Sequence, residues 1–379
     1  MKKLFAALLA LVLVTGCSSG GSSSALKIGV DLELTGTLAD YGNSEATGVE
    51  LAVSLANANG GALGTDIELV KLDNLSDSAE AQSVFIKLAD VEKVSAIISP
   101  ATSGATAAVY PLADEFGVPT VGASATADGI TQDASGNVYA NAFRVCFLDS
   151  FQGIAMAKFA KNTLNATKAV VLGDSSSDYA KGLRENFVTT FKSLGGTIVG
   201  EESYISGDKD FNAALTKIAQ MDLDVLYVPG YYSEAGLIIK QARALGIDCP
   251  VIGGDGFDSP SLLEVAGASA LNDVYFTTAY TTVTTDPVIL DFVAAYKAEY
   301  NKEPDMFAAL SYDATSLIID AATRANSYEP AKIQEALVAT KDFKGVTGSI
   351  SFDDKHNAIK SVLVVELVDG VQTNSVEVK

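Results

Sequence analysis

The chain has 379 residues, enough for about two domains that each bury a hydrophobic core. Its 47 acidic and 26 basic residues give a formal net charge of -21 at pH 7. This charge excludes nucleic acid and anionic membrane surfaces as ligands, because both are themselves negatively charged.

The first 16 residues are predicted to be a lipoprotein signal peptide. Two lysines precede eleven apolar residues, 4–14, which are too few for a permanent membrane-spanning helix of about 20 residues. The following Val14-Thr15-Gly16-Cys17 resembles the bacterial lipoprotein box, in which the cysteine is lipidated. We expect residues 17–26 to be the lipidated Cys17 and a flexible Gly/Ser tether. The alternative is an ordinary secretory signal with an incidental cysteine.

From residue 26 onward, apolar runs alternate with segments of helical spacing. We expect strands at 26–34, 67–72, 94–98 and 139–147 and helices at 43–59 and 78–90. After residue 98 we expect a Ser/Thr/Gly loop, a short helix that begins near Ala105, a second apolar strand and a second loop. This alternation predicts a parallel sheet covered by helices on both faces. Ligands bind such sheets beyond the carboxyl ends of the strands, where the Ser/Thr/Gly loops 99–105 and 122–127 would lie.

The second half of the chain repeats the same order. Its expected strands are 168–173, 197–204, 225–229 and 251–253, and its helices are 180–194, 211–220 and 233–245. After the first strand of each half comes an acid followed by a tyrosine, Asp40-Tyr41 and Asp178-Tyr179. Two similar sheets that face each other would bring the matching loops to one cleft.

The last hundred residues are too helical to complete only the second half. We expect a strand at 274–278, helices at 287–300, 307–326 and 330–339, and a terminal strand pair, 349–352 and 362–367. The chain would therefore cross between the lobes three times. Lobe 1 is expected to hold residues 27–147 plus 275–348, and lobe 2 residues 148–274 plus 349–379.

Seven stretches in this order carry a family resemblance. They are IGVDLELTGTLADYGNSEATGVELA, LDSFQGIAMAKF, DYAKGLRENF, SGDKDFNAAL, PGYYSEAGLIIKQARALG, GGDGFDS and LSYDATSLIIDA. The chain resembles the branched-chain (leucine, isoleucine, valine) amino-acid binding lipoproteins of ABC transporters. The resemblance implies a type I periplasmic-binding-protein clamshell, that is, an α/β fold of two Rossmann-like lobes with parallel sheets and three hinge crossings.

The candidate binding residues suit a free amino acid, which presents a carboxylate beside an ammonium. Ser103 and Thr126 offer hydroxyls near a helix N-terminus for the carboxylate, and Asp255 can accept from the ammonium. The resemblance implies the same ligand-binding positions and adds Ser124 and Tyr231 as further contacts. It also implies walls around the side chain, formed by Tyr41, Tyr179 and Phe307. Taken singly, these residues also fit helix caps, a glycine-rich turn and packing aromatics. The best-studied family members carry glutamate where this chain has Asp255, which is one methylene shorter.

No enzymatic site can be assembled from the sequence. The single histidine, His356, lies in a polar turn and is expected to be solvated, and no catalytic pair, metal-ligand spacing or G-x-G-x-x-G motif is present. We therefore expect no cofactor and no metal. The predicted protein is a lipid-anchored monomer on the extracytoplasmic face of a bacterial membrane, at the cell surface or in the periplasm. Its predicted partners are a small amino acid, an ABC permease and its ATPase. The alternative is a ligand-sensing receptor or a binding protein for an amide, urea or aromatic acid.

Overall fold

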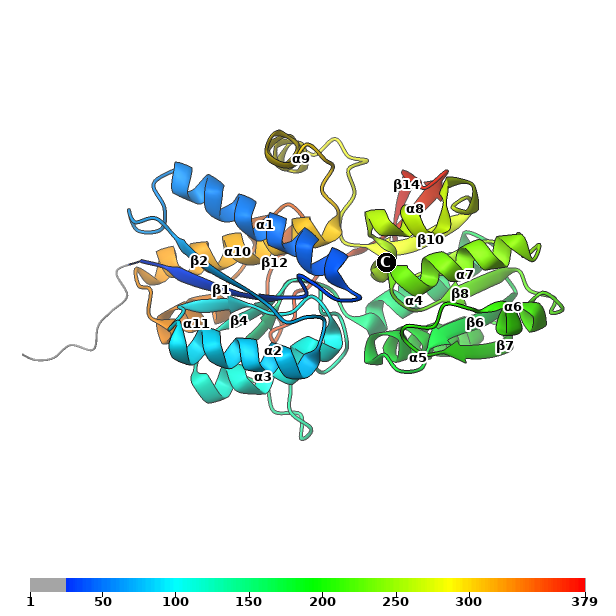
Figure 1. The fold of residues 1–379 in the computed structure, drawn as a ribbon, viewed down its shortest axis with the longest axis horizontal. Helices are drawn as coiled ribbons and strands as arrows, with labels where there is room; N and C mark the ends of the chain where they lie inside the picture. Colours follow the sequence, from blue (N-terminus) through cyan, green and yellow to red (C-terminus); the bar gives the residue numbers. More distant parts are fainter. Residues whose placement is uncertain (1–24, 379) are drawn as a thin grey trace, which may run out of the picture.

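Two β-sheets form the centres of two lobes that lie side by side (Figure 1). A computed structural model describes residues 25–378. The first sheet contains β1 (Lys27–Leu32), β2 (Glu68–Asp73), β3 (Ala96–Ile98), β4 (Thr120–Gly122) and β5 (Ala142–Arg144). Its order is β2-β1-β3-β4-β5, and every pair of neighbouring strands is parallel.

The second sheet contains five strands that are consecutive in the chain and two from its end. They are β6 (Lys168–Asp174), β7 (Thr197–Tyr204), β8 (Val225–Val228), β9 (Val251–Gly253), β10 (Val274–Thr278), β13 (Val362–Val368) and β14 (Val371–Val378). The order is β14-β13-β10-β9-β8-β6-β7. The pairs from β7 to β10 are parallel, whereas β13 and β14 extend the sheet with antiparallel pairs.

Helices cover both sheets, as the alternating pattern predicts. The first lobe has α1 (Ala39–Ala58), α2 (Ser78–Ile86), α3 (Ser103–Phe116), α9 (Pro287–Tyr300), α10 (Met306–Ala325) and α11 (Pro330–Val338). The second lobe has α4 (Asp149–Asn162), α5 (Asp178–Ser193), α6 (Asn212–Ile218), α7 (Tyr232–Ala244) and α8 (Pro260–Ala266). The chain passes between the lobes three times, after β5, after β10 and before β13. This is the predicted two-lobed α/β architecture.

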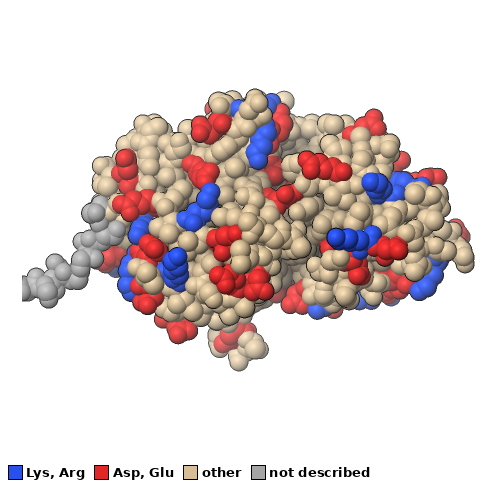
Figure 2. Space-filling view, viewed as in Figure 1, with Lys and Arg blue, Asp and Glu red and all other residues tan. Residues whose placement is uncertain are grey.

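Apolar strand residues account for the core of each lobe. Ile28, Val30 and Leu32 alternate along β1 and are fully buried, and β3, β4 and β8 have no exposed residue. Continuous apolar strands of this kind are typical of parallel sheets that helices cover on both faces. On the face shown in Figure 2, acidic and basic side chains are interspersed over both lobes.

The prediction that strands 349–352 and 362–367 pair with each other is wrong. Residues 348–350 form β12, which pairs with β11 (Phe343–Gly345) in a separate two-stranded sheet. The strand expected at 362–367 is β13, and it pairs with β10 and with the unpredicted β14. Asp369 and Gly370, both with positive φ, form the two-residue turn between β13 and β14. An Asp-Gly pair between apolar runs is a strong hairpin signal, so this strand could have been predicted.

Two of the expected lobe boundaries also differ from the structure. β10 hydrogen-bonds β9 and β13, so the chain leaves the second sheet after Thr278 and not at Val274. Residues 349–358 lie on the first lobe, because β12 pairs with β11 and the Arg144 amide donates to His356 O at 3.2 Å. The contacts that set these lobe boundaries join residues far apart in the sequence, so local sequence patterns do not predict them.

The remaining histidine and cysteines have simple environments. His356 is half-buried and stacks on Phe143 with ring centroids 4.3 Å apart, so it is not the solvated residue we expected. Cys146 is buried and Cys249 is half-buried, and both are free cysteines. The expected signal peptide and the lipidated Cys17 lie outside the described residues. Within residues 25–378, no helix combines the length and hydrophobicity needed to cross a membrane.

Candidate functional site

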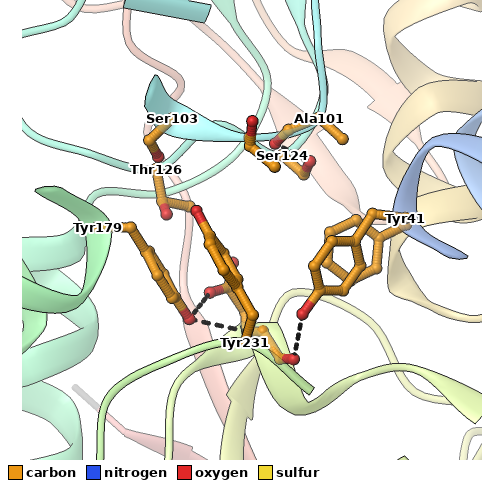
Figure 3. Close-up of a pocket in the computed structure, with 11 residues that line it drawn as sticks. Tyr41, Ala101, Ser103, Ser124, Thr126, Tyr179 and Tyr231 are labelled. Carbon is orange, nitrogen blue, oxygen red and sulfur yellow. Dashed lines mark hydrogen bonds between the residues drawn. The ribbon is translucent and has the colours of Figure 1, made fainter. Parts of the chain in front are cut away.

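A small pocket lies between the lobes at the carboxyl ends of the strands (Figure 3). All eight predicted ligand-binding residues line it: Tyr41, Ser103, Ser124, Thr126, Tyr179, Tyr231, Asp255 and Phe307. Ala101, Thr102 and Gly256 complete the lining. Lobe 1 supplies the serine and threonine loops, and lobe 2 supplies Asp255 and two tyrosines. The structure therefore brings the matching loops of the two halves together.

The N-terminus of helix α3 forms the lobe 1 side of the pocket. Helix α3 begins at Ser103, two residues earlier than expected, with Thr102 in the cap position. The Ser103 hydroxyl accepts a hydrogen bond from the Ala127 amide at 3.1 Å, so its own proton remains available to an acceptor in the pocket. The first amides of a helix have no partner within it, and together with such hydroxyls they favour a carboxylate.

Glu33 holds the loop between β3 and α3 in place. Its carboxylate accepts from the Ala101 amide at 2.9 Å, the Thr102 amide at 3.1 Å and the Thr102 hydroxyl at 2.7 Å. Glu33 is fully buried, and burial raises the pKa of its carboxyl above the usual range despite these bonds. This acid fixes the position from which α3 starts.

Ser124 is already engaged within lobe 1. Its hydroxyl lies 2.5 Å from Glu45 Oε1 and 2.8 Å from Ala101 O, and it has a single proton to donate. Burial raises the pKa of Glu45 well above its usual range. Ser124 therefore shapes the lobe 1 loop, and Ser103, whose proton is unused, is better placed to donate to a ligand.

Asp255 forms the acidic end of the pocket on lobe 2. Its Oδ1 accepts from the Tyr179 hydroxyl at 2.7 Å and from Gln152 Nε2 at 3.1 Å, while its amide donates to Gln152 Oε1 at 3.1 Å. No bond within residues 25–378 uses Oδ2. One oxygen is thus fixed by the protein, and the other is available to a donor in the pocket.

Buried acids outnumber buried bases around this end of the pocket. Burial raises the pKa of Asp255 to about 6, although the bonds from Tyr179 and Gln152 oppose the shift. Asp149, fully buried, has its pKa raised well above the usual range by burial and then by the charge of Asp255. Asp149 Oδ2 has no hydrogen-bond partner in the described part of the chain. No lysine or arginine lines the pocket, so a bound cation would offset this negative charge.

Aromatic rings form the remaining walls. Tyr179 and Tyr231 stack with ring centroids 5.0 Å apart, and Tyr41 stacks on Phe307 at 4.3 Å. The Tyr41 hydroxyl donates to Gly256 O at 2.5 Å and accepts from the Tyr232 amide at 3.1 Å. Tyr41 belongs to lobe 1 and both partners belong to lobe 2. The described conformation is therefore a closed one, in which a wall residue also joins the lobes.

Comparison with known proteins agrees with this geometry. A family model described as "Periplasmic binding protein" matches residues 25–372. The chain belongs to the periplasmic binding protein family. A second model, a prokaryotic membrane lipoprotein lipid attachment site, matches residues 1–18 of this binding protein, including Cys17. Together they place it on the extracytoplasmic face of the membrane with a lipid anchor, as predicted.

Similar solved structures include a branched-chain amino-acid transporter substrate-binding protein and a leucine-binding protein. The chain shares 44% identity with the substrate-binding protein LivJ of Streptococcus pneumoniae, solved with isoleucine, covering 94% of this chain and 100% of that one with a TM-score of 0.89. The leucine-binding protein LivK of Thermotoga maritima is 37% identical, covering 94% of this chain and 99% of that one with a TM-score of 0.87. The leucine-, isoleucine-, valine-, threonine- and alanine-binding protein of Pseudomonas aeruginosa is 28% identical over 94% of this chain and 92% of its own.

Several residues of the site were missed in the sequence. Glu33 and Glu45 are charges within otherwise buried segments, and a charge in such a place is itself a signal of a polar role. Asp149 and Gln152 lie in the first turn of α4, inside one of the stretches that carried the resemblance. In residues 25–378 no cluster of three or more histidine, cysteine or acidic side chains is arranged to hold a metal ion.

Proposed function

We propose that this binding protein captures a branched-chain amino acid outside the cytoplasmic membrane and delivers it to an ABC permease and its ATPase. The observation that carries the proposal is the asymmetry of the pocket. Ser103 and the α3 N-terminus offer donors on lobe 1, and Asp255 offers a buried acceptor on lobe 2. A zwitterion matches both ends at once. The names of the similar proteins support the transport role.

In this proposal, Ser103 and Thr126 bind the α-carboxylate, and Asp255 Oδ2 accepts from the α-ammonium. Charge-assisted hydrogen bonds contribute roughly 1.5 to 3 kcal/mol each, so three or four supply much of the ~8 kcal/mol that micromolar binding requires. Tyr231 lines the pocket on lobe 2 and would add a hydroxyl or backbone contact to the ammonium. Asp255 is one methylene shorter than glutamate, and we expect the ammonium to reach it directly or through one water.

The aromatic walls select an apolar side chain. Tyr41, Phe307 and Tyr231 offer ring faces and edges, and neither of the Tyr41 hydroxyl bonds points to a ligand, because both go to lobe 2 backbone. Burying an aliphatic side chain of four carbons among these rings contributes about 2 to 3 kcal/mol. A polar side chain would lose its hydration there without a partner.

Closure of the lobes is the proposed mechanism. The ligand docks on lobe 1, and lobe 2 then brings Asp255 and Tyr231 over it through the three crossings. The bonds of Tyr41 to Gly256 and Tyr232 form only in the closed state, so they complete the closure that ligand binding favours. The permease would recognise this closed form of a monomer.

A binding role without chemistry fits the same pocket. Its eleven lining residues include an acid and several hydroxyls but no histidine, cysteine or lysine. The alternative ligands are less suited to the site: an aromatic acid or urea would leave the buried Asp255 without a cation. A sensory role would use the same pocket, and the partner in the membrane distinguishes it from transport.

Calorimetry on the soluble domain, residues 25–379, tests the proposal. We expect leucine, isoleucine or valine to bind with micromolar or tighter affinity. Isoamylamine, which lacks the carboxylate, and 4-methylpentanoate, which lacks the ammonium, should each bind at least about a hundredfold more weakly than leucine. If no aliphatic amino acid binds, or if 4-methylpentanoate binds as tightly as leucine, the zwitterion site is wrong. Co-purification with a permease would distinguish transport from sensing.

A further inference from the structure

Arg144 is a buried cation that the binding scheme leaves unused. It ends β5, it has no exposed surface, and it is among the largest fully buried side chains of the protein. None of the ion pairs within residues 25–378 includes it. A buried guanidinium without a carboxylate is costly, so the bonds that compensate it indicate what it does.

Those bonds go to the loop that carries Thr126. Arg144 Nη1 donates to Ala125 O at 3.1 Å and to Ala127 O at 2.7 Å, so it holds the carbonyls on both sides of Thr126. Arg144 Nε donates to Asn357 Oδ1 at 2.7 Å, which anchors the guanidinium to the lobe 1 segment that precedes the third crossing. Thr126 lines the pocket, whereas Arg144 does not. The guanidinium therefore lies behind the loop.

Because the peptide unit is planar, the bond from Arg144 to Ala125 O also sets the direction of the Thr126 N–H. In a trans peptide unit the C=O of one residue and the N–H of the next point in opposite directions. Because Ala125 O points at Arg144, the Thr126 N–H points away from Arg144, toward the side of the loop on which Thr126 lines the pocket. Within the described residues, the Thr126 N–H has no hydrogen-bond acceptor. It is a donor held ready for an anion.

We propose that Arg144 is a positioning residue for ligand recognition: by clamping Ala125 O and Ala127 O it aims the Thr126 N–H at the ligand carboxylate. This inference rests on the proposed function, since it needs a ligand with a carboxylate at the lobe 1 end. Asn357 supports the same arrangement by holding Arg144 Nε. The residue acts through backbone atoms and touches neither the ligand nor the pocket.

A pair of ligands separates positioning from general stability. L-Leucine and L-leucinol share the ammonium and the side chain, but leucinol carries CH2OH in place of the carboxylate. Calorimetry, with competition for the weaker ligand, gives the two dissociation constants for the wild type, Arg144→Met and Asn357→Ala. We expect Arg144→Met to weaken leucine binding about 10- to 100-fold, the range of one lost charge-assisted bond. Leucinol binding should change less than about threefold.

Asn357→Ala is the milder variant and keeps the inference testable if Arg144→Met does not fold. It leaves the arginine in place but removes the acceptor of Nε, so leucine should weaken about 3- to 10-fold with leucinol again nearly unchanged. A spectroscopic readout is independent of affinity. Leucine should move the Thr126 amide proton downfield in the wild type, and this shift should be smaller in both variants.

Three results would overturn the inference. Equal weakening of leucine and leucinol in the variants would make Arg144 a structural residue only. Unchanged leucine affinity in a folded Arg144→Met would remove any role. A Thr126 amide that does not respond to leucine in the wild type would show that its N–H does not meet the carboxylate. If the wild type binds neither ligand, the proposed function itself fails, which is a distinct outcome.

Discussion

Leucine affinity is expected to fall as the pH drops below about 6, because Asp255 must be ionised to accept from the ammonium. Asp255 is 3% exposed, and burial raises its pKa from the ordinary 3.8 to about 6. Leucine remains a zwitterion throughout this range, so the ligand itself does not titrate. Protonation of Asp255 would place a neutral acid opposite a buried ammonium, which is a costly arrangement.

The size of the effect follows from that pKa. With a value of about 6, roughly one tenth of the sites are protonated at pH 7 and roughly nine tenths at pH 5, so affinity should fall about tenfold between them. The stability of the unliganded fold changes in the opposite direction. A raised pKa means that the folded state binds the proton more tightly, so this group's contribution is full below about 3.8 and is lost as the pH rises through about 6.

Calorimetry from pH 5 to pH 7.5 in the wild type and in Asp255→Asn isolates this group. The variant keeps an oxygen for the bonds from Tyr179 and Gln152 but carries no charge. At pH 7 it should bind leucine about 30-fold or more weakly, the cost of leaving an ammonium without its buried partner. Its affinity should depend less on pH. Equal pH profiles for the two proteins, or equal affinities at pH 7, would refute the role of Asp255.

Three further predictions test other parts of the structure. Tyr41→Phe keeps the wall ring but loses the bonds to Gly256 O and the Tyr232 amide, so leucine affinity should fall about 5- to 100-fold in calorimetry, and unchanged affinity would mean that these bonds do not stabilise the closed state. Glu33→Ala leaves the donors of Ala101 and Thr102 without their acceptor, which should lower the free energy of unfolding by about 1 to 3 kcal/mol in urea titrations and weaken leucine binding; an unaltered denaturation midpoint would contradict this. Cys17→Ala should remove the lipid, moving the protein from the membrane fraction to the soluble fraction of cells labelled with palmitate; a variant that is still labelled would show that another residue carries the lipid.

Much of the fold was predictable from local patterns. The apolar runs in the first half became β1 to β5, and the expected helix 43–59 corresponds to α1 at Ala39–Ala58. Strand and helix periodicity are properties of short segments, so one sequence is enough to read them. The binding loops could also be predicted, because the carboxyl ends of parallel strands always meet at the same edge of a sheet.

Details of the site needed contacts between distant residues. Tyr179 was expected to be a wall, yet its hydroxyl also donates to Asp255 at 2.7 Å, across 76 residues of sequence. Ser124 was expected to contact the ligand, yet its hydroxyl lies 2.5 Å from Glu45 Oε1. Neither hydrogen bond can be predicted from sequence periodicity, because a bond between distant residues depends on how the elements pack.

The sequence by itself determined the export signal, the two-lobed α/β plan and the residue types at the mouth of the cleft, because each depends on local composition and spacing. Only the tertiary structure decided which polar groups are free to meet a ligand. Asp255 Oδ2 and the Thr126 N–H are available because Gln152, Tyr179 and Arg144 engage their neighbours. Most buried donors and acceptors find partners within the fold, so the groups along the cleft that packing leaves without a partner are the ones a ligand can meet.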